Sequence, residues 1–264
     1  MKIRVEPKPD PFWPEREFKT SEEVRSISKS LRAAELGMVA GIDAIRRTEI
    51  RKDRYLYLEG TRLTSEILKR IINTAIMAQG YVPSHTIAAS GEQCVDPHNQ
   101  GSGPIRANTS IIMDIFPRSQ TTGYFGDITR TVVRGRASER LKHAYHCVAK
   151  GQEIGFRRIR DGASAYDIHF EIVNYFASEG FPTGPMNGRM QGFFHGTGHG
   201  LGLDIHEAPS FGQRSKNILR TGNVVTVEPG LYYQGMGGVR LEDVVVVTKT
   251  GCRNLVDLPK FLEV

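Results

Sequence analysis

The sequence is poor in cysteine and has no long apolar run. Its three cysteines, Cys94, Cys147 and Cys252, are odd in number and lie far apart, so neither a disulfide framework nor a cysteine-based zinc site is expected. We interpret them as reduced thiols of the core. The longest apolar runs fall well short of the roughly 18 residues that span a bilayer, and the proline-rich, charged N-terminus lacks the apolar stretch of a signal peptide. A soluble, cytoplasmic protein without a membrane partner is therefore expected.

The chain also lacks the features of a nucleic-acid-binding module. Its net charge is +6 and its pI is about 9.3. The basic residues cluster at 46–54 and 157–160, near expected helix ends, where cations favour solvent and the helix dipole. Aromatic residues are not interleaved with them, and no known nucleic-acid motif is present. Nucleic acid is therefore not expected as a partner.

The chain does contain enough apolar sequence for a large core. Its 264 residues, 39% of them hydrophobic, fit one large domain or two fused halves. Thr20 and Glu23 form a capping-box pattern. Apolar residues then recur at steps of three and four as far as Ile45, which predicts a long amphipathic helix. Further helices are predicted at 61–79, 138–160 and 164–179.

The predicted elements follow the same order twice. Two helices and about three strands in each half indicate a duplicated α+β unit, in which helices cover an antiparallel sheet. Because strands and helices do not alternate strictly, a doubly wound parallel sheet is disfavoured. Residues 1–19 are expected to form a linker or extended arm before a domain at 20–264. Strands are predicted at 85–89, 110–116, 124–133, 192–206, 224–233 and 240–248.

Four acidic residues lie in or beside apolar, β-branched segments that a globular protein buries. Neighbouring buried carboxylates lose solvation and repel one another, so they need cations to remain ionised. Asp114 and Asp127 lie on consecutive predicted strands, and a hairpin would direct both side chains to one face. With one histidine, the acids form a ligand set for two metal ions: Asp114, Asp127, His199, Glu228 and Glu242.

Three histidines, His195, His199 and His206, lie in the glycine-rich segment HGTGHGLGLDIH. Glycine at this density destabilises a helix, so these histidines are not the helical pair of a zincin. The backbone is instead expected to turn sharply and to approach a bound ion or ligand closely. A lone buried histidine is usually a core residue, but this clustering favours a metal or substrate site.

Arg240 and Glu242 are two residues apart and are expected to share one face of a strand. The alternative is a surface ion pair, which would contribute little. The run of valines at Val244–Val247 indicates an interior strand. We therefore interpret Arg240 as a group that orients a metal-ligating carboxylate without itself binding the metal.

Four segments of the chain together resemble a known family. GYFGDITRT, HGTGHGLGLDIHEAP, VEPGLYY and GGVRLED are similar to the proline-specific pita-bread metallopeptidases, namely Xaa-Pro aminopeptidase (aminopeptidase P) and Xaa-Pro dipeptidase (prolidase). The resemblance covers about residues 20–250. It implies a pita-bread fold around a dinuclear metal site, and metal-dependent hydrolysis of the Xaa-Pro bond at the N-terminus of peptides or in dipeptides.

The resemblance assigns a role to each candidate ligand. Asp114 would bind one metal, Asp127 and Glu242 would bridge both, and His199 with Glu228 would complete the other. Two metals in such a site lower the pKa of a shared water, which then attacks the scissile carbonyl as hydroxide. The oxygen-rich ligand set favours Mn²⁺, with Co²⁺ or Zn²⁺ as alternatives.

The same resemblance identifies the residues that handle the substrate. Glu228 is expected to accept and return the proton, and His206 to stabilise the carbonyl oxygen as negative charge develops. His98 is expected near the scissile bond on the opposite side, and His195 against the substrate beyond that bond. Tyr232 is expected to line the pocket.

The sequence departs from the family pattern in two places. The link between Asp114 and Asp127 is longer than usual by an even number of residues, which keeps both acids on one face but changes the pocket rim. Proline-specific relatives usually carry a separate N-terminal domain. The chain is therefore expected to be a catalytic-domain fragment or a short natural form, and the linker-like residues 1–19 favour a fragment.

Two alternative functions remain open at this stage. Methionine aminopeptidase fits the chain length, but its pattern usually has another residue at the position of Gly230 and lacks the arrangement from Arg240 to Asp243. A non-catalytic peptide-binding relative of the same fold is the second alternative. A peptide is the expected partner, and the oligomeric state is open, with a homodimer as one option.

Overall fold

The computed structural model describes residues 13–264. Most of the predicted arm at 1–19 thus lies outside the described residues. Its remaining part is not free, because η1 (Pro14–Glu17) leads into Lys19, which forms an ion pair with Glu207 of the second half. Within the described residues, no helix is long and apolar enough to cross a membrane.

Two helices begin the first half. α1 (Ser21–Arg46) starts at the predicted capping box, in which Thr20 and Glu23 each bond the backbone N–H of the other. The predicted apolar face is buried along its length. α2 (Ser65–Met77) begins later than predicted because Thr64 caps it.

Close contact between α1 and α2 decides which face of α2 is buried. A Cβ on Gly37 of α1 would lie 2.8 Å from Ile76 Cγ1, so the glycine lets the helices approach closely. The buried stripe of α2 is Leu68, Ile72 and Ile76. Ile67, Ile71 and Ala75, each one position before a residue of this stripe, are only partly buried.

A three-stranded antiparallel sheet of the first half carries the first acid pair. Its order is β5-β6-β8, and Asp114 of β6 lies opposite Thr129 of β8. Asp127 immediately precedes β8, so the two acids share one face, as the hairpin argument predicts. The strand bounds are β5 Ile87–Ser90, β6 Ile111–Ile115 and β8 Ile128–Val132.

The second half repeats this plan with a larger sheet. α3 (Glu139–Arg158) and α4 (Ala165–Ser178) precede an antiparallel sheet of order β12-β11-β13-β16-β17. A separate pair joins β14 to β15. The bounds are β11 Gly198–Gly200, β12 Glu207–Phe211, β13 Val224–Val227, β14 Gly230–Tyr233, β15 Gly237–Arg240, β16 Asp243–Val247 and β17 Cys252–Asn254.

Short elements complete the periphery. β1, β2 and β3 form one small sheet, β4 pairs with β7, and β9 pairs with β10. A 3₁₀ helix, η2 (Gly91–Val95), follows β5. The bounds are β1 Glu49–Ile50, β2 Leu56–Leu58, β3 Thr61–Arg62, β4 Tyr81–Val82, β7 Arg118–Ser119, β9 Gly184–Met186 and β10 Arg189–Gln191.

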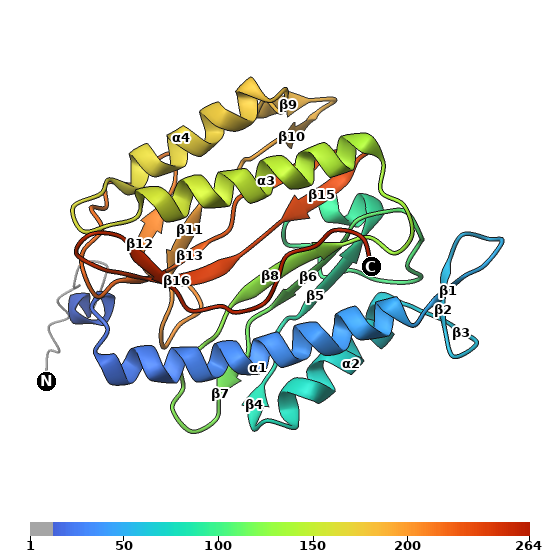
Figure 1. Ribbon diagram of the computed structural model, residues 1–264, viewed down its shortest axis with the longest axis horizontal. Coiled ribbons are helices and arrows are strands. Elements are labelled where there is room, and N and C mark those ends of the chain that lie inside the picture. The colour runs from blue at the N-terminus through green and yellow to red at the C-terminus, as the bar shows by residue number, and fades with distance from the viewer. Residues whose placement is uncertain (1–12) are drawn as a thin grey trace, which may run out of the picture.

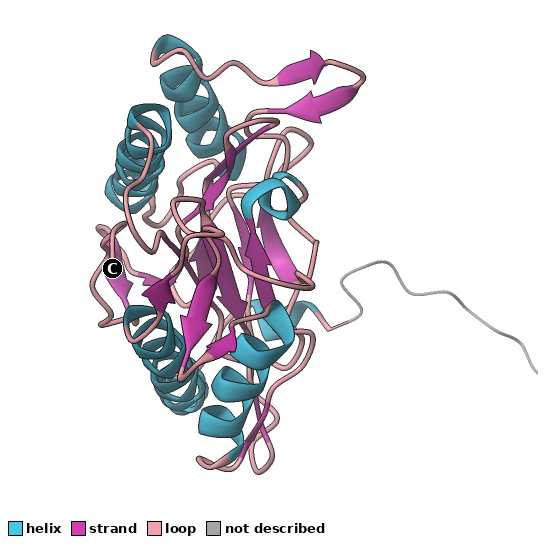
Figure 2. Cartoon of the chain, turned by 90° about the vertical axis from the view of Figure 1, so that its right-hand side faces the viewer, coloured by secondary structure: helices cyan, strands magenta, loops and turns pink. Residues whose placement is uncertain are grey.

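The two halves meet at the centre of the molecule. An isolated antiparallel bridge joins Thr129 of β8 to Glu242, which lies between β15 and β16. Figure 1 shows α1 and α2 along one edge, α3 and α4 along the other, and the strands of the two larger sheets between them. Turned by 90°, Figure 2 shows the strands in the middle with long helices to one side. The expected α+β architecture of two helix–helix–sheet halves is confirmed.

Candidate dinuclear metal site

All five predicted metal ligands line one cavity of about 390 Å³. The ligand atoms of three of them, Asp127, His199 and Glu242, lie within 4.8 Å of one another. They come from both halves of the fold, at or next to β8, β11 and the turn between β15 and β16. The central bridge between the halves therefore also assembles the site.

The orientation of His199 suits a metal ligand. Its Nδ1 lies 3.1 Å from the carbonyl oxygen of Gly200, and a carbonyl only accepts, so Nδ1 carries the proton. The lone pair of Nε2 then faces the acids, 3.5 Å from Glu228 Oε1 and 3.7 Å from Asp127 Oδ2. Burial lowers the pKa of His199 to about 3, so the imidazole is neutral.

The glycines on either side of His199 allow neighbouring strands of the sheet to pack closely. A Cβ on Gly198 would lie 2.0 Å from Thr226 O, and one on Gly200 would lie 2.3 Å from Ala208 O. Both contacts are with neighbouring strands of the sheet. The backbone approaches other atoms closely at both glycines, as expected. The atoms it approaches belong to β12 and β13, between which β11 packs, so the strand packing requires these two glycines and not an ion or ligand.

The clustered acids perturb one another strongly. Burial and the charge of Glu242 raise the pKa of Asp127 well above its usual range. Burial and the charge of Glu228 do the same for the pKa of Glu242, and burial raises the pKa of Glu228 to about 8. Arg240 opposes these shifts in each case. When ionised, the four carboxylates outnumber this cation, so the site favours additional positive charge.

Unpaired oxygens test whether these residues fit a metal. Asp114 Oδ1, Asp127 Oδ1 and Glu242 Oε1 are buried and have no hydrogen-bond partner. Buried polar atoms are almost always paired, so three such oxygens around one cavity call for a ligand. Carboxylate oxygens with one imidazole are the donors that hard divalent cations accept. The residues therefore fit the predicted metals.

Arg240 orients a different carboxylate from the one next to it in sequence. Its Nη2 lies 2.7 Å from Asp114 Oδ2, and its Nε donates to Thr129 Oγ1 at 3.3 Å. Glu242 instead accepts a 2.8 Å bond from the same Thr129 hydroxyl. The regular strand β15 ends at Arg240, but both side chains contact the Thr129 hydroxyl and line the same cavity, so they lie on one side of the chain as expected.

Tyr232 differs from the expected pocket wall. It is fully buried, and its hydroxyl accepts a 3.0 Å bond from Arg240 Nη1. His195 does line the cavity, with Nδ1 2.7 Å from Gly196 O and Nε2 2.8 Å from the Tyr232 hydroxyl. Since Nδ1 donates to the carbonyl, Nε2 accepts from Tyr232. Tyr232 therefore lies behind His195 and holds it in the cavity wall. Both ring nitrogens of His195 are hydrogen-bonded within the protein.

The remaining two histidines lie at the rim. His98 and His206 line the cavity and are exposed. The His206 ring meets that of His199 edge-on, with ring centroids 4.2 Å apart. Apolar side chains that sequence reasoning did not assign also line the cavity, among them Ile87, Phe116 and Phe211. Phe116 lies in the lengthened link after Asp114. The unusual length of this link was the feature of the sequence that indicated a changed pocket rim.

A buried glutamine that sequence reasoning missed connects two of the ligand segments. Gln152 of α3 donates from Nε2 to Val227 O at 2.8 Å and to Leu241 O at 3.2 Å. These carbonyls immediately precede Glu228 and Glu242. A single amide thus holds the backbone before both ligands in place. The only signal in the sequence was a polar residue at an apolar position of the predicted helix.

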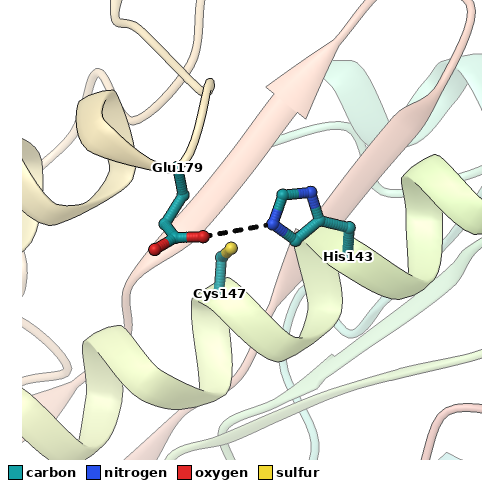
Figure 3. A group of neighbouring side chains, drawn as sticks. All are labelled: His143, Cys147 and Glu179. Carbon is teal, nitrogen blue, oxygen red and sulfur yellow. Dashed lines mark hydrogen bonds and ion pairs between the residues drawn. The ribbon is translucent and has the colours of Figure 1, made fainter.

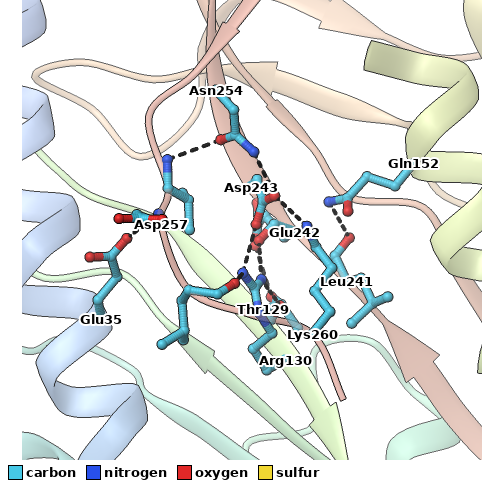
Figure 4. Close-up of polar contacts among 12 residues, drawn as sticks. Glu35, Thr129, Arg130, Gln152, Leu241, Glu242, Asp243, Asn254, Asp257 and Lys260 are labelled. Carbon is cyan, nitrogen blue, oxygen red and sulfur yellow. Dashed lines mark hydrogen bonds and ion pairs between the residues drawn. The ribbon is translucent and has the colours of Figure 1, made fainter. Parts of the chain in front are cut away.

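A buried ion pair supports Glu242 from the other side (Figure 4). Arg130 donates to the Glu242 carbonyl at 2.7 Å and pairs with Asp243 at 2.8 Å. Lys260 and Asn254 bond the second Asp243 oxygen. Since Asp243 follows Glu242 directly, this network fixes the backbone after the candidate ligand, whereas Gln152 fixes the backbone before it.

Comparisons with known proteins identify the family of the chain. The chain matches the model of metallopeptidase family M24 over residues 25–249. It is 31% identical over 240 residues to the Xaa-Pro dipeptidase of Pyrococcus horikoshii, covering 90% of this chain and 62% of that protein. It is 33% identical over 197 residues to the Xaa-Pro aminopeptidase of Escherichia coli, covering 66% of this chain and 44% of that protein.

Solved structures give the same picture. The prolidase from Pyrococcus furiosus superposes with a TM-score of 0.81 at 27% identity, over 95% of this chain and 68% of that one. The chain spans between 44% and 62% of the two curated relatives described above. These likenesses confirm the predicted pita-bread fold, and a metallopeptidase family implies divalent metal ions. The chain belongs to metallopeptidase family M24.

Proposed function

We propose that the chain hydrolyses Xaa-Pro peptide bonds, at the N-terminus of peptides or in dipeptides, with two divalent metal ions. The observation that carries the proposal is the convergence of four acids and one imidazole on one cavity, with three buried carboxylate oxygens unpaired. The names of the relatives, Xaa-Pro dipeptidase and Xaa-Pro aminopeptidase, support the substrate class. Residues 20–264 would form the catalytic domain.

The proposed ligands are five of the residues that line the cavity. Asp114 would bind one metal, Asp127 and Glu242 would bridge the two, and His199 with Glu228 would complete the other. When bound, the metals would lower the pKa of a shared water and polarise the scissile carbonyl. The oxygen-rich donor set favours Mn²⁺ over Co²⁺ or Zn²⁺.

The chain's own residues supply proton transfer and charge stabilisation. Glu228 lines the cavity and faces His199, so it is the proposed acceptor for the proton released during attack. His206 at the rim is the proposed hydrogen-bond donor to the carbonyl oxygen as charge develops. His98, which also lines the cavity, would contact the substrate next to the scissile bond.

Preference for proline would arise from shape. An Xaa-Pro bond has no N–H, so its pocket needs no acceptor there and can recognise the ring by apolar contact. Ile87, Phe116 and Phe211 provide such surface in the cavity. His195 would act as a wall, because both its nitrogens are bonded within the protein.

Other expectations stay predictions. A peptide is the proposed partner, and nucleic acid is not. A homodimer remains one option for the assembly. A cytoplasmic location stays a prediction as well.

The test is a substrate panel after metal replacement. Chelation should abolish hydrolysis, and Mn²⁺ should restore it with close to two metal ions per chain by elemental analysis. The reloaded protein is then assayed with Ala-Pro, Ala-Pro-Ala and Met-Ala-Ser. Faster release of methionine than of alanine would favour a methionine aminopeptidase, and metal binding without hydrolysis would favour a peptide-binding protein.

A further inference from the structure

A second group of metal-binding side chains lies on the outer surface of the second half (Figure 3). It consists of His143 and Cys147 on α3 and of Glu179, which directly follows α4. One ligand atom from each of the three lies within 4.8 Å of the other two. None of these residues lines the cavity of the acid cluster, so the group is independent of the proposed catalytic site.

The fold holds the three side chains in this arrangement. His143 and Cys147 are four residues apart on α3, which puts them on one face of the helix. α4 packs against α3, and its C-terminal end brings Glu179 over that face. The ring of Phe181 lies 5.1 Å from that of His143, which restricts the imidazole. The ligand atoms are therefore preorganised by packing.

The distance between two of the ligand atoms suits a tetrahedral ion. His143 Nε2 and Glu179 Oε2 are 3.3 Å apart, which is long for a charge-assisted hydrogen bond. Tetrahedral zinc with ordinary bond lengths to nitrogen and oxygen separates two such ligands by about 3.4 Å. The side chains of His143 and Glu179 are 50% and 40% exposed, whereas Cys147 is buried, so the fourth position would open to solvent.

We propose that His143, Cys147 and Glu179 form a binding site for a zinc-class divalent cation, which joins α3 to the end of α4. A thiolate, an imidazole and a carboxylate favour Zn²⁺ or Co²⁺ over the hard ions that an all-oxygen site accepts. Binding would release the thiol proton to solvent and leave a metal–thiolate bond. The expectation that no cysteine serves a zinc site rested on the absence of paired cysteines, and it did not include ligands brought together by folding.

The test uses the thiolate as a spectroscopic label. Co²⁺ is titrated into the full chain, and near-ultraviolet charge-transfer absorption from sulfur to cobalt is recorded. We expect this absorption in the wild type and its loss in Cys147→Ser. Cys252→Ser should retain it, and this variant controls for binding of Co²⁺ to a partly exposed cysteine elsewhere in the chain. Its absence in the wild type, or its persistence in Cys147→Ser, would overturn the proposal.

A second measurement avoids substitution of a buried residue. Zn²⁺ affinity is measured by competition with a chromophoric chelator in an Asp127→Asn background, which weakens the catalytic site. His143→Ala should weaken the remaining site at least tenfold, and His146→Ala, an exposed histidine on the same helix, should not. Equal affinities of these two variants would mean that His143 and Glu179 form only an ion pair. Because neither readout is hydrolysis, failure here leaves the proposed peptidase function untouched.

Discussion

Arg240 and Asp114 form a short, nearly buried ion pair, with 2.7 Å between Nη2 and Oδ2 and side-chain exposures of 4% and 13%. The pair uses one oxygen of Asp114 and leaves Oδ1 without a protein partner. Arg240 thus fixes the direction of the carboxylate while keeping one oxygen available for a cation. It is also the cation that opposes the raised pKa values of Asp127, Glu228 and Glu242.

Removing this guanidinium should destabilise the metal-free protein more than the metal-loaded protein. Arg240→Met leaves Asp114 buried without its partner, and breaking a buried ion pair costs about 3 kcal/mol or more. We expect urea unfolding to show this loss after chelation, with partial recovery in Mn²⁺. The exposed pair Lys150–Glu153 gives the control: Lys150→Met should have a much smaller effect, and a similar effect would contradict the prediction.

Glu228 should be needed for turnover even where metal remains bound. Glu228→Gln keeps the shape of the side chain but removes the proton acceptor, so kcat should fall at least about a hundredfold. Metal content is measured on the same sample. A variant that keeps its metals and turns over at the wild-type rate would show that another residue accepts the proton.

His206 should contribute mainly to kcat. It is exposed at the rim, so His206→Ala should leave the unfolding free energy nearly unchanged. Loss of a donor to the developing oxyanion should lower kcat by on the order of a hundredfold. His146→Ala, remote from the cavity, should retain wild-type kinetics. If KM rose while kcat stayed constant, His206 would instead serve ground-state binding.

Gln152 should position two ligands from a distance. Gln152→Leu leaves two buried carbonyls without their donor, which should cost about 2 kcal/mol of stability and weaken Mn²⁺ binding, measured by electron paramagnetic resonance titration. Gln191 is also buried and donates to a backbone carbonyl, that of Met186. Gln191→Leu should lower stability without changing Mn²⁺ affinity. Equal Mn²⁺ affinity in both variants would reduce Gln152 to a purely structural role.

His169 should make the fold sensitive to acid. It is buried, bonds the Thr197 hydroxyl at 3.0 Å, and burial lowers its pKa from 6.5 to about 4. Below pH 6.5 the unfolded chain therefore takes up a proton that the folded chain does not. The unfolding free energy should fall as pH decreases from about 6.5 to 4, by up to about 3 kcal/mol from this group. His169→Gln should show a shallower decrease between pH 7 and 4, and an identical slope would contradict the assignment.

The sequence by itself predicted the repeating features of this protein. The apolar spacing and the Thr20–Glu23 capping box predicted α1, because helix periodicity and capping depend on residues a few positions apart. The β-branched segments around Asp114 and Glu242 indicated burial for the same local reason. The five candidate ligands were therefore recognised before the fold was known, and the fold brings all of them to one cavity.

Only the tertiary structure decided which groups contact one another. It paired Arg240 with Asp114 and not Glu242, placed Tyr232 behind His195, and set the buried face of α2 through Gly37. It also brought Gln152 to two ligand segments and Glu179 to Cys147. Each of these contacts joins residues that are distant in sequence, and hydrogen bonds and metal sites depend on positions in space to within a few tenths of an ångström. Periodicity predicts the face on which a side chain lies, but not the residue it meets there.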